Sequence, residues 1–182
     1  MLSLLDGLPP LAKARTAGLF YLLTFVAGSL ALLVHTTIGS VAGLIAAASY
    51  VAVTVLFYDL FKPVHQRLSL AAALVSLGGI VAGPLGLGLR ALVFFGVYCL
   101  LVGYLIFRST FLPRALGALM AIAGLGWLTF VSMPLVESWF PYNLAPGIVG
   151  EGVLTLWLLF AGVDVRRWHE QAGTMPLRGH TA

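Results

Sequence analysis

The chain consists of long apolar runs separated by short polar segments. The clearest run extends from Thr16 to Tyr58 and contains no Asp, Glu, Lys or Arg across 43 residues. At about 1.5 Å of helical rise per residue, this run is roughly twice as long as a bilayer core is thick. It therefore has to fold back on itself, and the segment from His35 to Ser40 is its turn-like interruption. Two membrane-spanning helices are predicted here, over residues 14–34 and 41–60.

Turn residues and charges divide the rest of the chain. Residues 62–67 form a polar connection in which Pro63 cannot comfortably continue a helix. The Gly- and Pro-rich residues 83–88 indicate a tight outer turn, and residues 136–146 form an outer loop rich in aromatic side chains, which favour the headgroup region. The predicted fold is an all-α membrane protein, a six-transmembrane-helix bundle over residues 14–34, 41–60, 68–85, 91–107, 115–133 and 147–163.

The two ends of the chain lie outside this transmembrane domain of residues 14–164. Residues 1–13 are apolar but are interrupted by Asp6 and by Pro9 and Pro10, so we expect a short interfacial segment. Residues 165–182 are expected to form a polar cytoplasmic tail. A cleaved signal peptide is the competing interpretation of the first span, but its apolar stretch is too long and lacks a clear cleavage site.

Composition supports a membrane protein and excludes other classes. Hydrophobic residues make up 60% of the chain and charged residues only 9%, which is too little polar surface for a soluble domain of 182 residues. The basic residues are dispersed rather than gathered on one module, so nucleic acid is not an expected partner. The expected partners are membrane lipids and, as a second expectation, other integral membrane proteins.

The distribution of Lys and Arg predicts the orientation. With six spans, only Arg90 falls on the outer face, and the other nine fall on the opposite face: Lys13, Arg15, Lys62, Arg67, Arg108, Arg114, Arg166, Arg167 and Arg178. Because positive residues accumulate in cytoplasmic loops, both termini are predicted to be cytoplasmic.

Few residues suit a metal or a cofactor. Cys99 is the only cysteine, so neither an intramolecular disulfide nor a cysteine zinc site can form. His35 and His65 are predicted on opposite faces of the membrane and cannot both ligate one haem. We expect no cofactor and no metal site.

Glycine is abundant, with 21 residues, and small residues allow transmembrane helices to approach closely. The spacing of Gly39 and Gly43, and of Gly79 and Gly83, suits such contacts. Further points of close approach are predicted at Gly96, Gly103, Gly117, Gly124 and Gly126.

Several segments resemble a known bacterial membrane family. They include residues 14–21, 62–64, 92–96 and 99–105, the more specific block RSTFLPRALG at 108–117, Gly150-Glu151, and residues 157–159 and 162–163. Together they resemble the family catalogued as domain of unknown function 4386, over about residues 14–167. The resemblance implies a six-helix bacterial membrane protein of the cytoplasmic (inner) membrane and implies no activity. Tyr98 stands where members of that family often have His.

Glu151 is the leading candidate for a functional residue, because an ionisable side chain within a span is costly unless it is paired or hydrated. It lies about one turn inside the sixth predicted helix, at a level similar to Arg90, so a pair between them is a hypothesis. The functional interpretation is an outward-facing polar pocket for a lipid or small molecule. The structural interpretation is that Glu151 only pins helices together. Other residues that could join the cluster are His35, Glu137, Tyr142 and Asn143.

Polar residues on the inner face have a simpler explanation. Asp59 and Lys62 are three residues apart and are predicted to form a local ion pair. Inner-face contacts with lipid headgroups are predicted for Lys62, Arg67, Arg108 and Arg114.

Three classes of function remain open. The first is lipid or small-molecule binding at Glu151, and the second is an accessory or assembly subunit of a larger membrane complex. The third is an intramembrane enzyme, for which only Glu151, His35 and Tyr142 or Tyr98 could serve, without forming a recognised motif. The sequence favours binding or an accessory role over catalysis.

Overall fold

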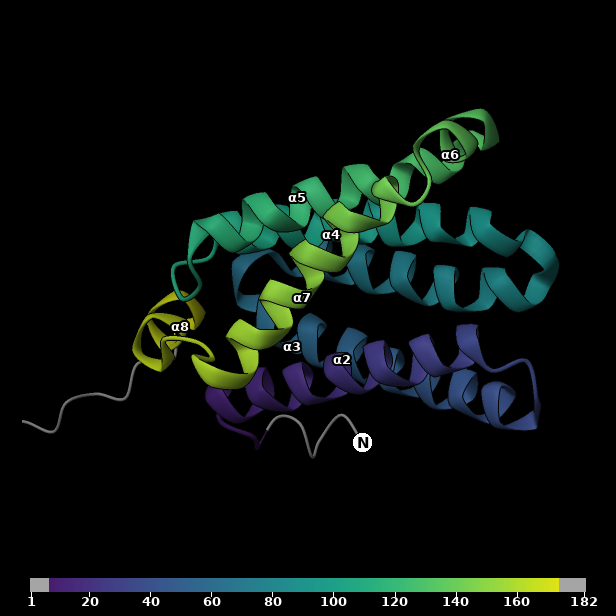
Figure 1. Ribbon diagram of the computed structural model, residues 1–182. Coiled ribbons are helices and arrows are strands. Elements are labelled where there is room, and N and C mark those ends of the chain that lie inside the picture. The colour runs from purple at the N-terminus through teal and green to yellow at the C-terminus, as the bar shows by residue number, and fades with distance from the viewer. Residues whose placement is uncertain (1–6, 174–182) are drawn as a thin grey trace, which may run out of the picture.

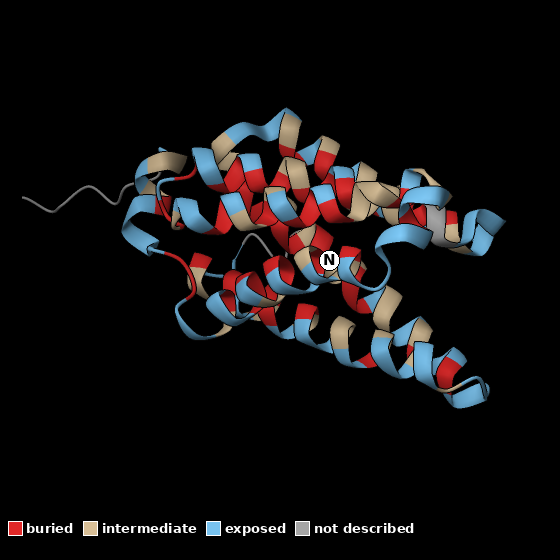
Figure 2. Cartoon of the chain, turned by 45° about the horizontal axis from the view of Figure 1, so that its top comes forward, coloured by how far each residue is buried: buried red, intermediate tan, exposed pale blue. Residues whose placement is uncertain are grey.

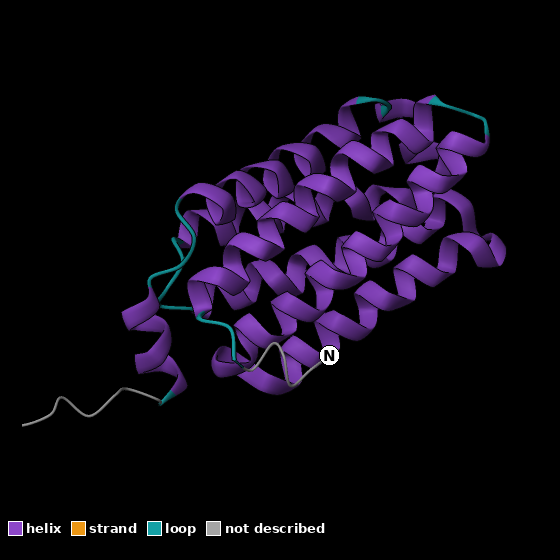
Figure 3. Cartoon of the chain, turned by 90° about the horizontal axis from the view of Figure 1, so that it is seen from below, coloured by secondary structure: helices purple, strands orange, loops and turns teal. Residues whose placement is uncertain are grey.

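The computed structural model describes residues 7–173, apart from the side chains of Leu89 and Arg90. This part of the chain is helical throughout and contains no strand (Figures 1 and 3). Short loops and short helices at the two ends of the bundle connect the long helices. The helices are α2 (Pro10–Leu33), α3 (Thr37–Ala82), α4 (Leu92–Arg108), α5 (Arg114–Leu128), α6 (Met133–Trp139), α7 (Ala145–Phe160) and α8 (Val165–Ala172).

The helix α3 is folded back on itself at His65, whose φ of −163° and ψ of 97° are not helical. The hydroxyls of Thr54 and Ser76 lie 2.7 Å apart, although 22 residues of straight helix would separate them by about 33 Å. A second contact, from the Ser69 hydroxyl to the Tyr58 carbonyl at 3.0 Å, follows the same antiparallel register. Two arms result, residues 37–64 and 66–82, and they lie side by side (Figure 1).

The reversal falls inside the predicted polar connection of residues 62–67, but its details differ from the prediction. The helical backbone continues through Pro63 and breaks two residues later. Nδ1 of His65 accepts a hydrogen bond from the Leu68 backbone N–H at 3.2 Å. This bond satisfies one of the free N–H groups at the start of the second arm, so His65 caps it.

Four helical stretches of the described chain have the length and apolar composition needed to cross a membrane: Pro10–Leu33, Thr37–Leu87, Arg114–Val131 and Tyr142–Phe160. The helix Leu92–Arg108 is apolar but shorter. Together they indicate a multi-pass membrane protein. The outward surfaces are largely exposed, whereas buried residues lie between the helices (Figure 2).

The α4 and α5 helices pack with their backbones almost in contact. A Cβ added to Gly103 would lie 2.8 Å from the Gly117 carbonyl oxygen, and one added to Gly124 would lie 2.8 Å from that of Gly96. These two glycine pairs confirm the predicted points of close approach at these four positions. Gly83, in contrast, has nothing within 4 Å of an added Cβ.

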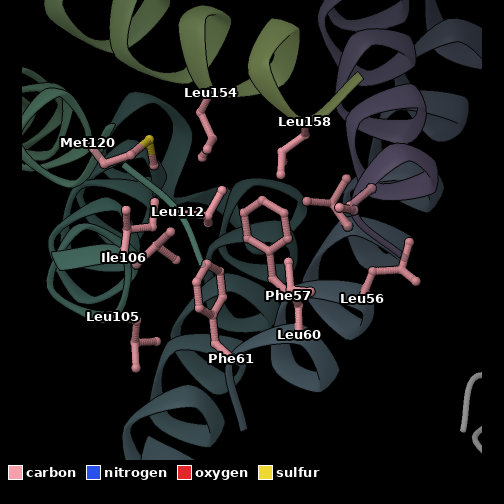
Figure 4. Packing of buried hydrophobic residues seen from close by; sticks show 14 of the residues in the cluster. Leu56, Phe57, Leu60, Phe61, Leu105, Ile106, Leu112, Met120, Leu154 and Leu158 are labelled. Carbon is pink, nitrogen blue, oxygen red and sulfur yellow. The ribbon is translucent and has the colours of Figure 1, made fainter. Parts of the chain in front are cut away.

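The buried core continues from the middle of the bundle toward α8. Figure 4 shows Phe57 and Phe61 of α3 facing Leu154 and Leu158 of α7, with Met120 of α5 beside them. All five are almost fully buried. This core holds α3, α5 and α7 together below the site described next.

Three segments differ from the sequence-based expectations. The outer turn is a helical segment, Gly83–Leu87, followed by Gly88–Ala91, and Gly86 and Gly88 take positive φ values of 92° and 51° that glycine tolerates best. The short α6 occupies part of the predicted loop at residues 136–146. The predicted tail begins with α8, whose first turn is capped by the Asp164 side chain, which accepts from the Arg167 backbone N–H. The rest of that tail, residues 174–182, and residues 1–6 of the interfacial segment lie outside the described residues.

Candidate functional site

Glu151 of α7 is the centre of a hydrogen-bonded cluster inside the bundle, and only 6% of the residue is exposed. Its Oε2 accepts a hydrogen bond from the Tyr21 hydroxyl at 2.6 Å. Its Oε1 accepts from Nε1 of Trp127 at 2.5 Å and, more weakly, from Sγ of Cys99 at 3.6 Å. The carboxyl therefore joins side chains from α2, α4, α5 and α7.

Two glycines on α7 create the space for this arrangement. Gly147, one turn before Glu151, lies against the indole ring of Trp127, where a Cβ would collide with the ring. A Cβ on Gly150 would lie 2.6 Å from the Leu119 carbonyl oxygen of α5. Because α7 can approach α5 so closely, the indole N–H reaches the carboxyl of Glu151.

Aromatic side chains surround the carboxyl on the side of α3. The ring of Tyr50 packs against those of Tyr21 at 5.6 Å, Phe95 at 5.1 Å and Tyr98 at 6.0 Å, measured between centroids. The hydroxyls of Tyr50 and Tyr98 are buried and have no hydrogen-bond partner among the described residues. An unsatisfied buried hydroxyl is costly, and of these two side chains Tyr50 lines the cavity described next.

A cavity of about 330 Å³ opens beside Glu151. Its walls come from α2, both arms of α3, α4, α5 and α7, and it extends to Gly83 and Ala91 at the outer turn. The lining is mostly apolar. Its polar side chains are Thr24, Tyr50, Trp127 and Glu151.

The other residues predicted for this site lie elsewhere or are not described. His35 and Tyr142 are exposed and do not line the cavity. Asn143 is buried, but its Nδ2 donates to the Thr129 hydroxyl at 3.3 Å, so it fastens the segment after α6 to the end of α5. Glu137 is exposed. The side chain of Arg90 lies outside the described part of the structure, so its pairing with Glu151 stays a prediction.

No pattern in the sequence associates Glu151 with Tyr21, Trp127, Cys99 or Tyr50. Tyr21 is 130 residues from Glu151 along the chain, and Trp127 is 24 residues away. The only available signal was that a polar group within an apolar span needs a partner. That rule asks for partners but does not identify them.

A second polar cluster lies at the end of the bundle nearest α8. Asp59 forms ion pairs with Lys62, as predicted, and with Lys13 of α2. Both Asp59 and Lys13 are buried. Nζ of Lys13 also lies 5.8 Å from the ring centroid of Trp168, whose Nε1 donates to the Leu60 carbonyl at 2.9 Å. These contacts attach α8 to α2 and α3.

The remaining residues predicted to contact inner-face lipids are Arg67, Arg108 and Arg114, and all three are exposed. The guanidinium of Arg114 lies 5.9 Å from the ring centroid of Phe107. The Arg108 backbone carbonyl accepts from Nε2 of Gln171 at 3.3 Å, which brings the α4–α5 loop against α8.

These features define an all-helical protein with apolar helices, of the multi-pass membrane class, in which a buried carboxyl adjoins an open cavity. More specifically, the chain resembles the family described as Domain of unknown function (DUF4386), whose model matches residues 86–162. That match includes Cys99, Trp127 and Glu151 and confirms the resemblance found in the sequence. No curated protein and no solved structure matches the chain.

Proposed function

We propose that this chain is a six-helix protein of the bacterial cytoplasmic membrane, with both termini in the cytoplasm, that binds a lipid or small molecule in an outward-facing cavity at Glu151. The observation that carries this proposal is the 330 Å³ cavity with a buried carboxyl in its wall. Binding sites for small molecules are typically mostly apolar hollows of this size or larger, with a few polar groups that fix orientation.

The proposal of six crossings is supported by counting the two arms of α3 separately. The first arm, residues 37–64, and the second arm with the following turn, residues 66–87, are each long enough to cross a bilayer core. The helix α4 has 17 residues, which is at the lower limit for a crossing. With α2, α5 and α7 the total is six.

Cytoplasmic termini are supported by basic residues that the fold gathers at one end. Lys13 and Lys62 meet at Asp59, and Nη1 of Arg167 donates to the Thr110 carbonyl at 3.4 Å. Positive charges concentrate on the cytoplasmic side of membrane proteins, which supports the proposal that this end faces the cytoplasm. The cavity reaches the opposite end, at Gly83 and Ala91, and would therefore open outward.

Fusions test this orientation. Green fluorescent protein fused at the C-terminus is expected to fluoresce, whereas alkaline phosphatase inserted after Tyr142 is expected to be active, because it would lie outside. The reverse pattern would contradict the proposed orientation and the outward opening of the cavity.

Filling the cavity tests the binding function. Ala47 lines the cavity, whereas its neighbour Ala48 is exposed and does not line it. The Ala47→Phe variant should lose a lipid or small molecule that travels with the wild-type protein in native nanodiscs, and Ala48→Phe should retain it. Native mass spectrometry measures the bound mass in each.

Two results would reject the binding function. One is that no bound molecule is found in the wild type, and the other is that Ala47→Phe retains it in full. A membrane protein that co-purifies in fixed ratio, with no bound ligand, would instead favour an accessory subunit.

A further inference from the structure

We propose that the ligand is a compact amphiphilic amine, whose ammonium group binds between the Glu151 carboxyl and the Tyr50 hydroxyl and whose apolar body fills the cavity. This inference rests on the proposed binding function and specifies the chemical class of the ligand. It follows from the unused acceptors, the aromatic walls and the volume of the cavity.

The Glu151 carboxyl retains room for another donor. A carboxylate has about four acceptor positions, and the described contacts use two of them well and a third weakly. Among the described residues, Oε2 accepts only from the Tyr21 hydroxyl. All three described partners are neutral, and among the described side chains no Lys or Arg pairs with Glu151. A cationic donor would therefore supply both a hydrogen bond and the opposite charge.

The hydroxyl of Tyr50 is the second, independent observation. Tyr50 lines the same cavity, is 6% exposed, and its hydroxyl oxygen has no hydrogen-bond partner in the described structure. A hydroxyl oxygen accepts hydrogen bonds, and an ammonium group has up to three N–H donors. One ammonium can thus satisfy the carboxyl and the hydroxyl together.

Aromatic rings in the walls also suit a cation. Tyr50 and Phe95 meet at an interplanar angle of 88°, so the two rings form a corner, and Trp127 adds a third ring to the lining. Aromatic rings beside a carboxylate stabilise ammonium groups through cation–π attraction. An anionic ligand would meet the carboxyl with repulsion and would find no basic side chain among the described lining residues.

The size of the cavity limits the apolar body. At about 30 Å³ for each water-sized group, 330 Å³ corresponds to roughly eleven non-hydrogen groups. Phenylbutylamine has that size. Phenylbutanol shares its apolar body and carries a neutral hydroxyl, and phenylbutyric acid has the same carbon skeleton with the last carbon as an anionic carboxylate.

The experiment compares these three probes by isothermal titration calorimetry, with the full chain in phosphatidylcholine nanodiscs and with heats from empty nanodiscs subtracted. The amine should bind saturably and at least about tenfold more tightly than the alcohol, the effect of one charge-assisted hydrogen bond. The acid should not bind. Glu151→Gln should abolish the preference for the amine.

Tyr50→Phe keeps the ring and removes the hydroxyl, so it tests the same geometry if Glu151→Gln fails to fold. It should lower the affinity for the amine several-fold and leave that for the alcohol nearly unchanged. Ala47→Phe should abolish binding of both, and Ala48→Phe should change neither.

Binding of the alcohol or the acid as tight as that of the amine, or tighter, would overturn the proposal that the ligand is an amine. Loss of that binding in Ala47→Phe would still support a binding cavity. An amine preference that survives both Glu151→Gln and Tyr50→Phe would also overturn this geometry. If none of the probes binds saturably, the amine is rejected. The binding function itself is then decided by the native mass measurement on Ala47→Phe and Ala48→Phe.

Discussion

Two buried carboxyls of this bundle differ in their surroundings. Asp59, at the end of the bundle nearest α8, lies between Lys13 and Lys62. Glu151, near the middle of α7, accepts hydrogen bonds from neutral donors and borders a cavity. The charge of Asp59 is balanced within the fold, whereas that of Glu151 is balanced by no described side chain. A charge that the fold itself balances has a sufficient structural explanation, and the other carboxyl is the better candidate for binding.

The largest effect is expected when Asp59 is replaced by Asn, which leaves the buried ammonium of Lys13 without its counter-ion. Breaking one side of a buried ion pair costs about 3 kcal/mol or more in unfolding free energy. Unfolding by SDS titration in mild micelles measures this loss. Glu170→Gln is the control, because its ion pair with Arg166 is exposed and should cost about 0.5 kcal/mol or less. Equal losses of unfolding free energy in the two variants would show that Lys13 and Asp59 do not form a buried ion pair.

The close contact between α4 and α5 should be the next most sensitive feature. Gly103→Ala should cost about 2 kcal/mol, because its Cβ would press against the Gly117 carbonyl. Gly152→Ala is the matched control, since nothing lies within 4 Å of its added Cβ. The same SDS titration applies. Equal losses of unfolding free energy in these two variants would contradict the close approach of α4 and α5.

Glu151→Gln should cost only about 1 kcal/mol, well below Asp59→Asn. The amide oxygen can still accept from Trp127, and the Tyr21 hydroxyl can turn to accept from the amide nitrogen. Both isosteric variants are compared in one unfolding series. A loss of unfolding free energy in Glu151→Gln as large as that in Asp59→Asn would contradict the contrast between the two carboxyls. It would favour a purely structural role for Glu151.

The smallest effect is expected at Trp168. Trp168→Phe removes the hydrogen bond to the Leu60 carbonyl and should cost about 1 kcal/mol or less, because α8 lies at the edge of the bundle. Hydrogen exchange should rise in residues 165–172 and stay unchanged around Glu151. Faster hydrogen exchange around Glu151 would show that α8 and the cluster around Glu151 are coupled.

Patterns that act locally along the chain could be predicted. Charge-free runs located the apolar helices, and the spacing of three residues gave the ion pair of Asp59 and Lys62. Contacts between distant segments could not be predicted, because they depend on how the helices rotate and approach. Lys13 and Asp59 are one such pair, and Tyr21 and Glu151 are another.

Other differences arose from local signals that were available but outweighed. Asp164 is a typical helix-capping residue and could have indicated α8, but the polar composition of residues 165–182 favoured a tail. Pro134 suits the first turn of α6, yet the aromatic residues after it favoured a loop.

The glycine pairs of α4 and α5 have a consequence for motion. A slide of α4 by one helical turn would bring Leu100 and Phe107 to the places now held by Gly96 and Gly103, where the facing backbone leaves no space. These two helices therefore move as one rigid wall. On the other side, Gly28 and Gly43 of the α2–α3 hairpin make only ordinary contacts, at 3.9 and 3.7 Å from an added Cβ. Because both contacts lie between α2 and the first arm of α3, these two helices have room to shift against each other that α4 and α5 lack.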